Sequence, residues 1–173
     1  EGFLYHSMDI SKAHNVFSTD MMPARWTHLI SGYGKVLGNS FSRNKRLRYN
    51  YITITVDQAK LAANNKIIPL DAEYVHYRRS LNHNLGPSGV PTFSDRKQVA
   101  MGQVRKTQSA FFQEEFVIGD IKNLHKKIVK IDLRTDKVYG SIRDPSKRQF
   151  INAARFIQNY ADKYQIDFVV DKK

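Results

Sequence analysis

The sequence predicts one globular domain of the α+β class, and three observations support this prediction. Its 173 residues match a single domain, because one hydrophobic core typically extends over about 100–200 residues. Apolar residues make up 41% of the chain, which is enough to build that core. Strand patterns dominate the middle of the chain and helical patterns its ends, and this order favours an α+β fold over a doubly wound parallel sheet.

The N-terminal part begins with a predicted strand and helix. Residues 3–7 are apolar and aromatic, as in a strand, and residues 9–18 follow with helical spacing behind Asp9, which is suited to an N-cap. Residues 21–30 are expected to form a short helix. The glycine-rich residues 31–40 are expected to form a loop.

The middle of the chain has the clearest strand pattern. In residues 49–57, isoleucine and valine alternate with tyrosine and threonine, so the two faces of the strand should be unlike. Residues 57–71 predict a capped helical turn or two, a stop at two asparagines and another short strand. Residues 82–97 predict a long surface loop, and loops of this length within a compact domain are often functional.

The last third of the chain adds strands and one helix. Residues 115–121 and 126–134 are expected to be strands, and residues 166–170 the closing strand. Asp144 and Pro145 are suited to start the helix between them. One side of this helix carries a mainly apolar stripe, formed by Phe150, Ala154, Ile157, Ala161 and Tyr164.

The charge balance favours a polyanionic partner. The chain has 28 Lys and Arg against 16 Asp and Glu, a net charge of +12, which attracts nucleic acid or acidic membrane surfaces. A role in solubility or an acidic protein partner is the alternative. Cysteine is absent, which excludes disulfides and thiolate metal sites, and the apolar runs are shorter than the about 18 residues of a membrane span. A signal or domain preceding Glu1 is left open.

The histidines show no metal-binding spacing. The chain has six of them but no HExxH pair, and it lacks the glycine motifs of Rossmann and P-loop nucleotide sites. Most of the histidines are expected to lie at the surface or to have structural roles. His6 differs because it ends the first predicted strand, where its side chain can reach over the sheet edge into a cleft.

Two hydroxyl residues follow the glycine-rich segment. Ser40 and Ser42 are separated by one residue, so their side chains point to the same side of an extended segment and can bind one polar ligand. A turn rich in Ser and Asn with a solvated basic tail is the alternative interpretation.

An acidic cluster precedes the strand of residues 115–121. In an extended chain Gln113 and Glu115 share a face, whereas Glu114 points the other way. A carboxylate here can anchor a sugar hydroxyl and stabilise positive charge that develops on the sugar. Pairing of one glutamate with a Lys or Arg, with the other in water, is the alternative.

In this order, the three features resemble the ADP-ribosyltransferase superfamily. Its members begin with a strand ending in Arg or His, continue with a strand carrying a Ser-x-Ser-like motif, and have a Glu at the start of a later strand, often as Gln-x-Glu. The matching residues are His6, Ser40, Ser42 and Glu115, with Gln113 before the last of them.

The resemblance covers about residues 3–133, whereas the helix and strand within residues 145–170 have no counterpart. It implies a split mixed or antiparallel β-sheet core flanked by helices, in a single catalytic domain of residues 1–173. Phe41 departs from the family pattern, in which Thr or Leu is common between the two serines.

The resemblance implies an NAD-dependent mono-ADP-ribosyltransferase without a metal. Cleavage of the nicotinamide–ribose bond passes through an oxocarbenium-like state, which an anion near the sugar stabilises. Glu115 would supply that anion and hold a ribose hydroxyl. His6 would hydrogen-bond the adenosine ribose, Ser40 would order Glu115 and the nicotinamide ribose, and Ser42 or Arg43 would support the bound NAD.

The acceptor implied is a macromolecule. Gln113 would orient it, and a neutral amide at this position argues against an arginine acceptor. Together with the charge of +12, this favours nucleic acid or ribonucleoprotein over protein. The basic residues expected to meet phosphates are Lys45, Arg46, Arg48, Arg78 and Arg79.

A toxin or phage effector domain of this kind would act in the cytoplasm of a target cell. It would be delivered within a larger secreted toxin or a phage particle, could have an immunity protein as a partner, and would not insert into a membrane. Two alternatives stay open: a non-enzymatic RNA- or DNA-binding module, and a metal-independent ribonuclease with His6 or His83 as general base and acid.

Overall fold

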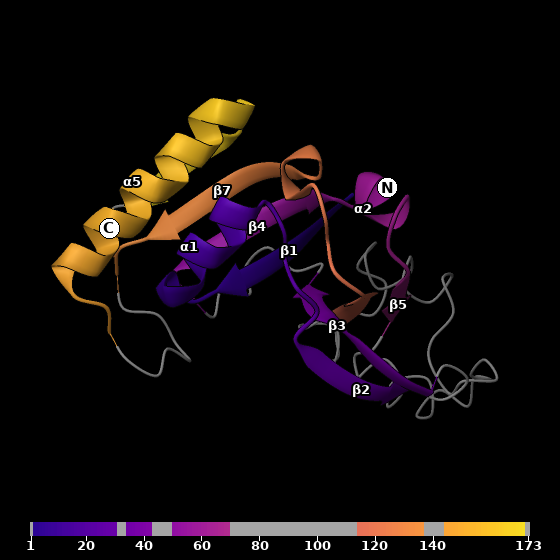
Figure 1. Ribbon diagram of the computed structural model, residues 1–173. Coiled ribbons are helices and arrows are strands. Elements are labelled where there is room, and N and C mark those ends of the chain that lie inside the picture. Colours follow the sequence, from indigo (N-terminus) through magenta and orange to yellow (C-terminus); the bar gives the residue numbers. More distant parts are fainter. Residues whose placement is uncertain (1, 31–33, 43–49, 70–113, 137–143, 172–173) are drawn as a thin grey trace, which may run out of the picture. The chain divides into compact units, whose positions relative to one another are not determined.

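The computed structural model describes residues 2–30, 34–42, 50–69, 114–136 and 144–171 (Figure 1). Contacts divide the chain into two compact units, each assembled from separated segments. The first unit contains residues 1–23, 48–64 and 120–173, and the second contains residues 24–47 and 65–119. The elements are helices and a mixed arrangement of strands, which confirms the predicted α+β class.

The first unit is built on the strands β1 (Phe3–Met8), β4 (Ile52–Asp57), β7 (Ile128–Arg134) and β8 (Asp167–Asp171), which lie side by side in this order. β4 is antiparallel to β1 and to β7, whereas β7 and β8 are parallel. Leu4, Ile54 and Ile131 point to one face of this sheet and are fully buried. This face forms the apolar core of the unit.

The face of β4 that carries the threonines is also buried. The unlike faces predicted for this strand are therefore not one buried face and one exposed face. Thr53 and Thr55 are 2% and 8% exposed. The Thr53 hydroxyl lies 3.1 Å from the hydroxyl of Ser7 on β1, and such hydrogen bonding allows polar side chains to be buried. The alternation in residues 49–57 therefore separates an apolar buried face from a polar buried face.

Helix α1 (Ile10–Thr19) begins where the sequence predicts it. The Asp9 side chain accepts a hydrogen bond from the backbone N–H of Ile10 at 2.8 Å. The helix ends at Asp20, whose left-handed backbone (φ 51°) turns the chain out of the helix. Its buried side, which includes Ala13 and Phe17, faces α5.

Helix α5 (Lys147–Tyr164) packs against α1 (Figure 1) and also contacts β8. It starts later than Asp144 and Pro145, because Ser146 and Gln149 form a capping box that satisfies backbone N–H groups at both positions. The buried side also differs in part from the predicted stripe. It consists of Ala153, Ile157, Tyr160 and Ala161.

The second unit contains the strands β2 (Trp26–Ile30), β3 (Gly34–Ser42), β5 (Ile67–Pro69) and β6 (Glu114–Ile118). They lie in the order β5, β6, β3, β2, and each neighbouring pair is antiparallel. β6 therefore has a strand on each side within this unit.

Two predictions for residues 21–40 are wrong. The expected helix of residues 21–30 ends in β2, which pairs with β3 from Trp26 opposite Gly38 onward. The expected loop of residues 31–40 is mostly β3, with residues 31–33 outside the described part. Strand pairing prevailed here because aromatic and β-branched residues suit β2 and because glycine also occurs in strands where backbones approach closely.

The remaining predicted elements within the described residues are confirmed, with small shifts of their bounds. α2 (Gln58–Ala62) is a short helix capped by Asp57. β5 and β7 fall in the predicted segments, β8 extends one residue beyond its segment, and β6 begins at Glu114 and ends at Ile118, before the predicted end at residue 121. The 3-10 turn η2 (Leu124–Lys126) was not predicted. The expected loop of residues 82–97 lies outside the described residues.

Candidate functional site

The serine motif and Glu115 lie on neighbouring strands of the second unit. β3 and β6 pair with Ser40 opposite Phe116, Phe41 opposite Glu115 and Ser42 opposite Glu114. Phe41 and Glu115, which are 74 positions apart in sequence (115 − 41), are thus direct cross-strand neighbours, whereas Ser40 is offset from Glu115 by one register step. This juxtaposition could not be read from the sequence alone, because it depends on long-range pairing.

The register determines which side chains share a face. Directly opposite residues of an antiparallel pair point to the same side of the sheet, and successive residues alternate. Glu115 therefore shares its face with Phe41 and Asn39, whereas Ser40 and Ser42 point to the other face. The resemblance implies that the Ser40 hydroxyl orders the Glu115 side chain, but this register does not support that contact. The residue directly opposite Glu115 is Phe41.

Glu115 is fully buried. Its exposed fraction is 0%, and the flanking Phe116 and Val117 are also 0% exposed. On its face of β3, Asn39 and Phe41 are each 2% exposed. A carboxylate in such surroundings is costly unless it is paired or hydrogen-bonded, so its retention here indicates a specific structural or functional role.

Gly38 allows β3 and β6 to approach. A Cβ atom added at this position would lie 2.0 Å from the backbone carbonyl oxygen of Val117. Because that oxygen belongs to the backbone, no side-chain rotation can relieve the overlap. Gly38, the third glycine of the segment predicted as a loop, is therefore a packing requirement of the strand pair that carries Ser40 and Glu115.

His6 lies in the first unit. It is within β1 opposite Ile54 of β4, and the strand continues to Met8, so His6 does not end it as expected. Its exposure is intermediate, and its position in the register places it on the face of Leu4 and Met8. His6 belongs to the first unit, whereas Ser40 and Glu115 belong to the second unit.

The remaining predicted site residues lie outside the described part of the chain. These are Gln113, Arg43, Lys45, Arg46, Arg48, Arg78 and Arg79, together with His83 of the ribonuclease alternative. Their roles stay predictions from the sequence.

A second polar cluster lies in the first unit, and no pattern in the sequence predicted it. The Asp20 carboxylate accepts hydrogen bonds from the backbone N–H of His125 at 2.8 Å, and its oxygens also contact the His125 ring Nδ1 and the Tyr160 hydroxyl. The His125 ring stacks on Tyr164 with centroids 4.1 Å apart. The cluster joins the end of α1, the turn η2 and helix α5.

Two residues at this cluster have shifted pKa values, and burial is the largest cause in both. Burial and the hydrogen bond to Asp20 raise the pKa of Tyr160 well above its usual range. Burial lowers the pKa of Lys127, although the nearby Asp20 opposes this effect. The Lys127 ammonium donates to the backbone carbonyl of Lys122. These bonds link elements of the unit, so we assign the cluster a structural role.

Other buried polar residues also escaped the sequence-based prediction. Asn39 on β3 and Asp132 on β7 are 2% and 4% exposed. The Nζ atom of Lys130 lies 3.4 Å from the carboxylate Oδ1 of Asp132. A lone Asn or Asp inside a strand pattern gives no signal of burial, because strand alternation predicts which residues share a face and not which face is covered.

In the described part of the chain, no three His, Asp or Glu side chains gather closely enough to hold a metal ion. The helices described there are also too short or too polar to cross a membrane. Comparison with protein-family models, with curated proteins and with solved structures found no match for this chain.

Proposed function

We propose that the protein is an NAD-dependent mono-ADP-ribosyltransferase, a toxin or phage effector domain, that transfers ADP-ribose to a macromolecular acceptor. The observation that carries this proposal is the pairing of β3 with β6, which sets the strand of Ser40 and Ser42 beside Glu115. The order of His6, the serine motif and Glu115 along the chain, which resembles the superfamily, adds to it.

The proposed reaction breaks the bond between C1′ of the ribose and the nicotinamide nitrogen. The bonding electrons leave with nicotinamide, and positive charge develops on the ribose ring. The Glu115 carboxylate stabilises this charge and holds a ribose hydroxyl. A nucleophilic atom of the acceptor then bonds to C1′ and loses its proton to solvent or a neighbouring base.

The burial of Glu115 strengthens such an interaction. A carboxylate at 0% exposure acts in a medium of low effective dielectric, where its attraction for a developing positive charge is larger than in water. Because no surface of Glu115 is exposed, NAD reaches it only if the side chains that cover it move. Phe41 is opposite Glu115 and is the first candidate for such a movement.

The register does not support the roles implied for the two serines. Ser40 and Ser42 point to the face opposite Glu115, and β6 lies between β3 and β5, so one NAD molecule bound at Glu115 does not reach both faces. Contact of Ser40 or Ser42 with NAD rests on the resemblance alone. His6 and Arg43 remain the proposed contacts to the adenosine ribose and the pyrophosphate. Gln113 remains the proposed residue that orients the acceptor.

The acceptor class is tested with labelled NAD. The purified protein is incubated with NAD labelled on the adenylate and with the protein, RNA and DNA fractions of a bacterial lysate. A nucleic acid acceptor, which the net charge of +12 favours, predicts label that resists protease and is released by nuclease.

Each outcome of this experiment decides a different part of the proposal. Label in the protein fraction alone would retain the reaction and overturn the acceptor class. Release of nicotinamide without label in any fraction would reduce the activity to NAD hydrolysis. Intact NAD in all fractions would contradict the proposed reaction.

A further inference from the structure

Helix α5 has two opposite faces of different character. Its buried side packs on other elements of the first unit and is formed by Ala153, Ile157, Tyr160 and Ala161. The aromatic residues of the helix also contact that unit: Phe150 lies against Tyr51, Phe156 against His14, Tyr160 against Phe17, and Tyr164 against His125. Apart from Ile151, which is 48% exposed, the large apolar side chains of α5 are therefore used in the fold.

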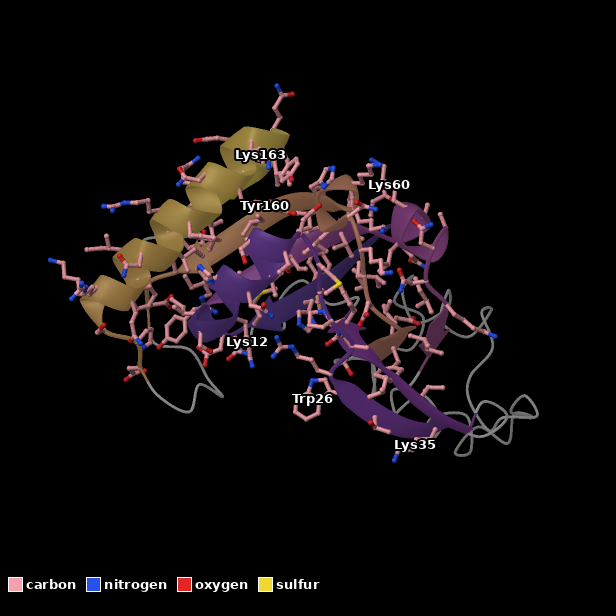
Figure 2. All side chains as sticks on the ribbon, viewed as in Figure 1. Lys12, Trp26, Lys35, Lys60, Tyr160 and Lys163 are labelled. Carbon is pink, nitrogen blue, oxygen red and sulfur yellow. The ribbon has the colours of Figure 1, made fainter. Side chains whose placement is uncertain are left out.

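The opposite side of α5 is an exposed basic strip. With about 100° of rotation per residue, spacings of four, three and four residues keep side chains on one face. This strip consists of Arg148, Asn152, Arg155 and Asn159, all exposed. Figure 2 shows the side chains along the outer side of this helix extending away from the rest of the first unit.

The cations of the strip are not used in ion pairs with described residues. Residues 147–161 contain no Asp or Glu, and the salt bridges recorded in the described segments involve neither Arg148 nor Arg155. Asp162, which follows this segment, accepts a hydrogen bond on its carboxylate from the side-chain amide of Gln158 at 2.8 Å. Within the described segments, the positive charges of Arg148 and Arg155 therefore have no acidic partner.

The position of these charges does not serve the stability of the helix. Lys147 and Arg148 occupy the first turn of α5, which contains no acidic residue. Cations are disfavoured there because the N-terminal end of a helix carries partial positive charge. Within the strip, Arg148 thus opposes the helix dipole, and neither it nor Arg155 has an acidic partner among the described residues, so both are available to an external anionic partner.

We propose that the exposed basic strip of α5 docks in the major groove of duplex DNA. The helix has 18 residues and is about 10–12 Å in diameter, and a B-form major groove, about 12 Å wide, admits a helix of this size. Arg148 and Arg155 are about 10 Å apart along the axis and meet phosphates or guanine edges. Asn152 and Asn159 lie between and beyond them, where an amide can pair with an adenine edge.

The same features argue against other nucleic acids. A-form RNA has a deep and narrow major groove that a helix does not enter. Single strands are usually held by exposed aromatic side chains on which bases stack, and the aromatic residues of α5 contact the first unit instead. Docking on duplex DNA needs neither NAD nor Glu115, so it is a property separate from the proposed transferase reaction.

The test compares two double variants with equal loss of charge. Arg148→Gln with Arg155→Gln removes the two cations of the strip. Lys12→Gln with Lys60→Gln is the matched control, because both lysines are exposed on other helices of the same unit (Figure 2). Binding of a fluorescent 20-base-pair duplex is measured by anisotropy, without NAD, over a range of salt concentrations, and circular dichroism checks that all variants are folded.

The strip variant is expected to bind the duplex about tenfold more weakly at about 0.1 M salt. The slope of the logarithm of its binding constant against the logarithm of salt concentration is expected to correspond to about two fewer phosphate contacts. The control is expected to stay within about threefold of the unmodified protein. Equal losses in both double variants would overturn the docking surface, as would equal or tighter binding of an RNA hairpin or a single strand. Absence of binding to the duplex by the unmodified protein would also overturn it.

Discussion

Asp20 shows how one residue can join three elements. Its left-handed backbone ends α1, and its carboxylate accepts hydrogen bonds from the backbone of His125 and from the hydroxyl of Tyr160 on α5. Its own backbone carbonyl accepts from the N–H of Leu124 at 3.0 Å. Loss of one of these donors leaves a partly buried carboxylate less well satisfied, which costs more than the average surface substitution.

Tyr160→Phe is expected to lower the free energy of unfolding by about 1–3 kcal/mol at neutral pH, because the Asp20 carboxylate loses a donor. Tyr164→Phe is the matched control, since no hydrogen bond is recorded for the Tyr164 hydroxyl among the described residues and its ring contacts are retained. Urea unfolding of the two variants measures the difference. An equal loss in both would contradict the role assigned to the Tyr160 hydroxyl.

Tyr160 also predicts a dependence on alkaline pH. Because its pKa is raised in the folded protein, the unfolded chain loses the phenolic proton near the ordinary value of 10.0 while the folded protein keeps it. The stabilisation is therefore fully present below pH 10 and decreases as the pH rises beyond it. Unfolding free energies between pH 9 and pH 11 should fall more steeply for the unmodified protein than for Tyr160→Phe; parallel curves would exclude this linkage.

Single residues were predicted unevenly from the sequence. Asp9 as a cap and the place of Glu115 within a strand follow from local rules and are confirmed. The Asp20 cluster could not be predicted, because it joins positions 20, 125 and 160 through tertiary contacts. The full burial of Glu115 likewise depends on which elements cover its face of the sheet.

At the scale of elements, the pairing of β3 and β6 positions the candidate site. Most strands and helices could be predicted because periodicity and capping residues are local, as in β4, β7 and α5. The hairpin of β2 and β3 could not, because its glycines favoured a loop. Gly38 is instead needed where β3 approaches the carbonyl of Val117, a contact between segments far apart in the chain.

Gly38→Ala is expected to disturb the β3–β6 pair. The new methyl group would lie 2.0 Å from the Val117 carbonyl oxygen, so the strands must shift, at a cost of about 1–3 kcal/mol or more. Ala63→Gly is a control of similar size at an exposed position beside α2. Thermal unfolding and amide exchange of β6 measure the effect, and protection of β6 equal to that of the unmodified protein would contradict the packing role of Gly38.

At the scale of the whole molecule, a strongly basic chain carries a fully buried carboxylate. The net charge of +12 favours an anionic macromolecular partner, and the strip on α5 offers a described surface for one. The α+β class was predictable from the order of strand and helix patterns. The division into two units was not, because each unit is assembled from segments separated in sequence.

The central claim concerns Glu115 and is tested most directly by nicotinamide release from NAD. Glu115→Gln keeps the size of the side chain and removes its charge, and Glu114→Gln is the matched control at the neighbouring position. Thermal unfolding of each variant separates loss of stability from loss of activity. If the Glu115 carboxylate stabilises the charge on ribose, Glu115→Gln should remain folded and release nicotinamide at least about 100-fold more slowly, with Glu114→Gln near the unmodified rate. Nicotinamide release by folded Glu115→Gln at the unmodified rate would contradict the claim.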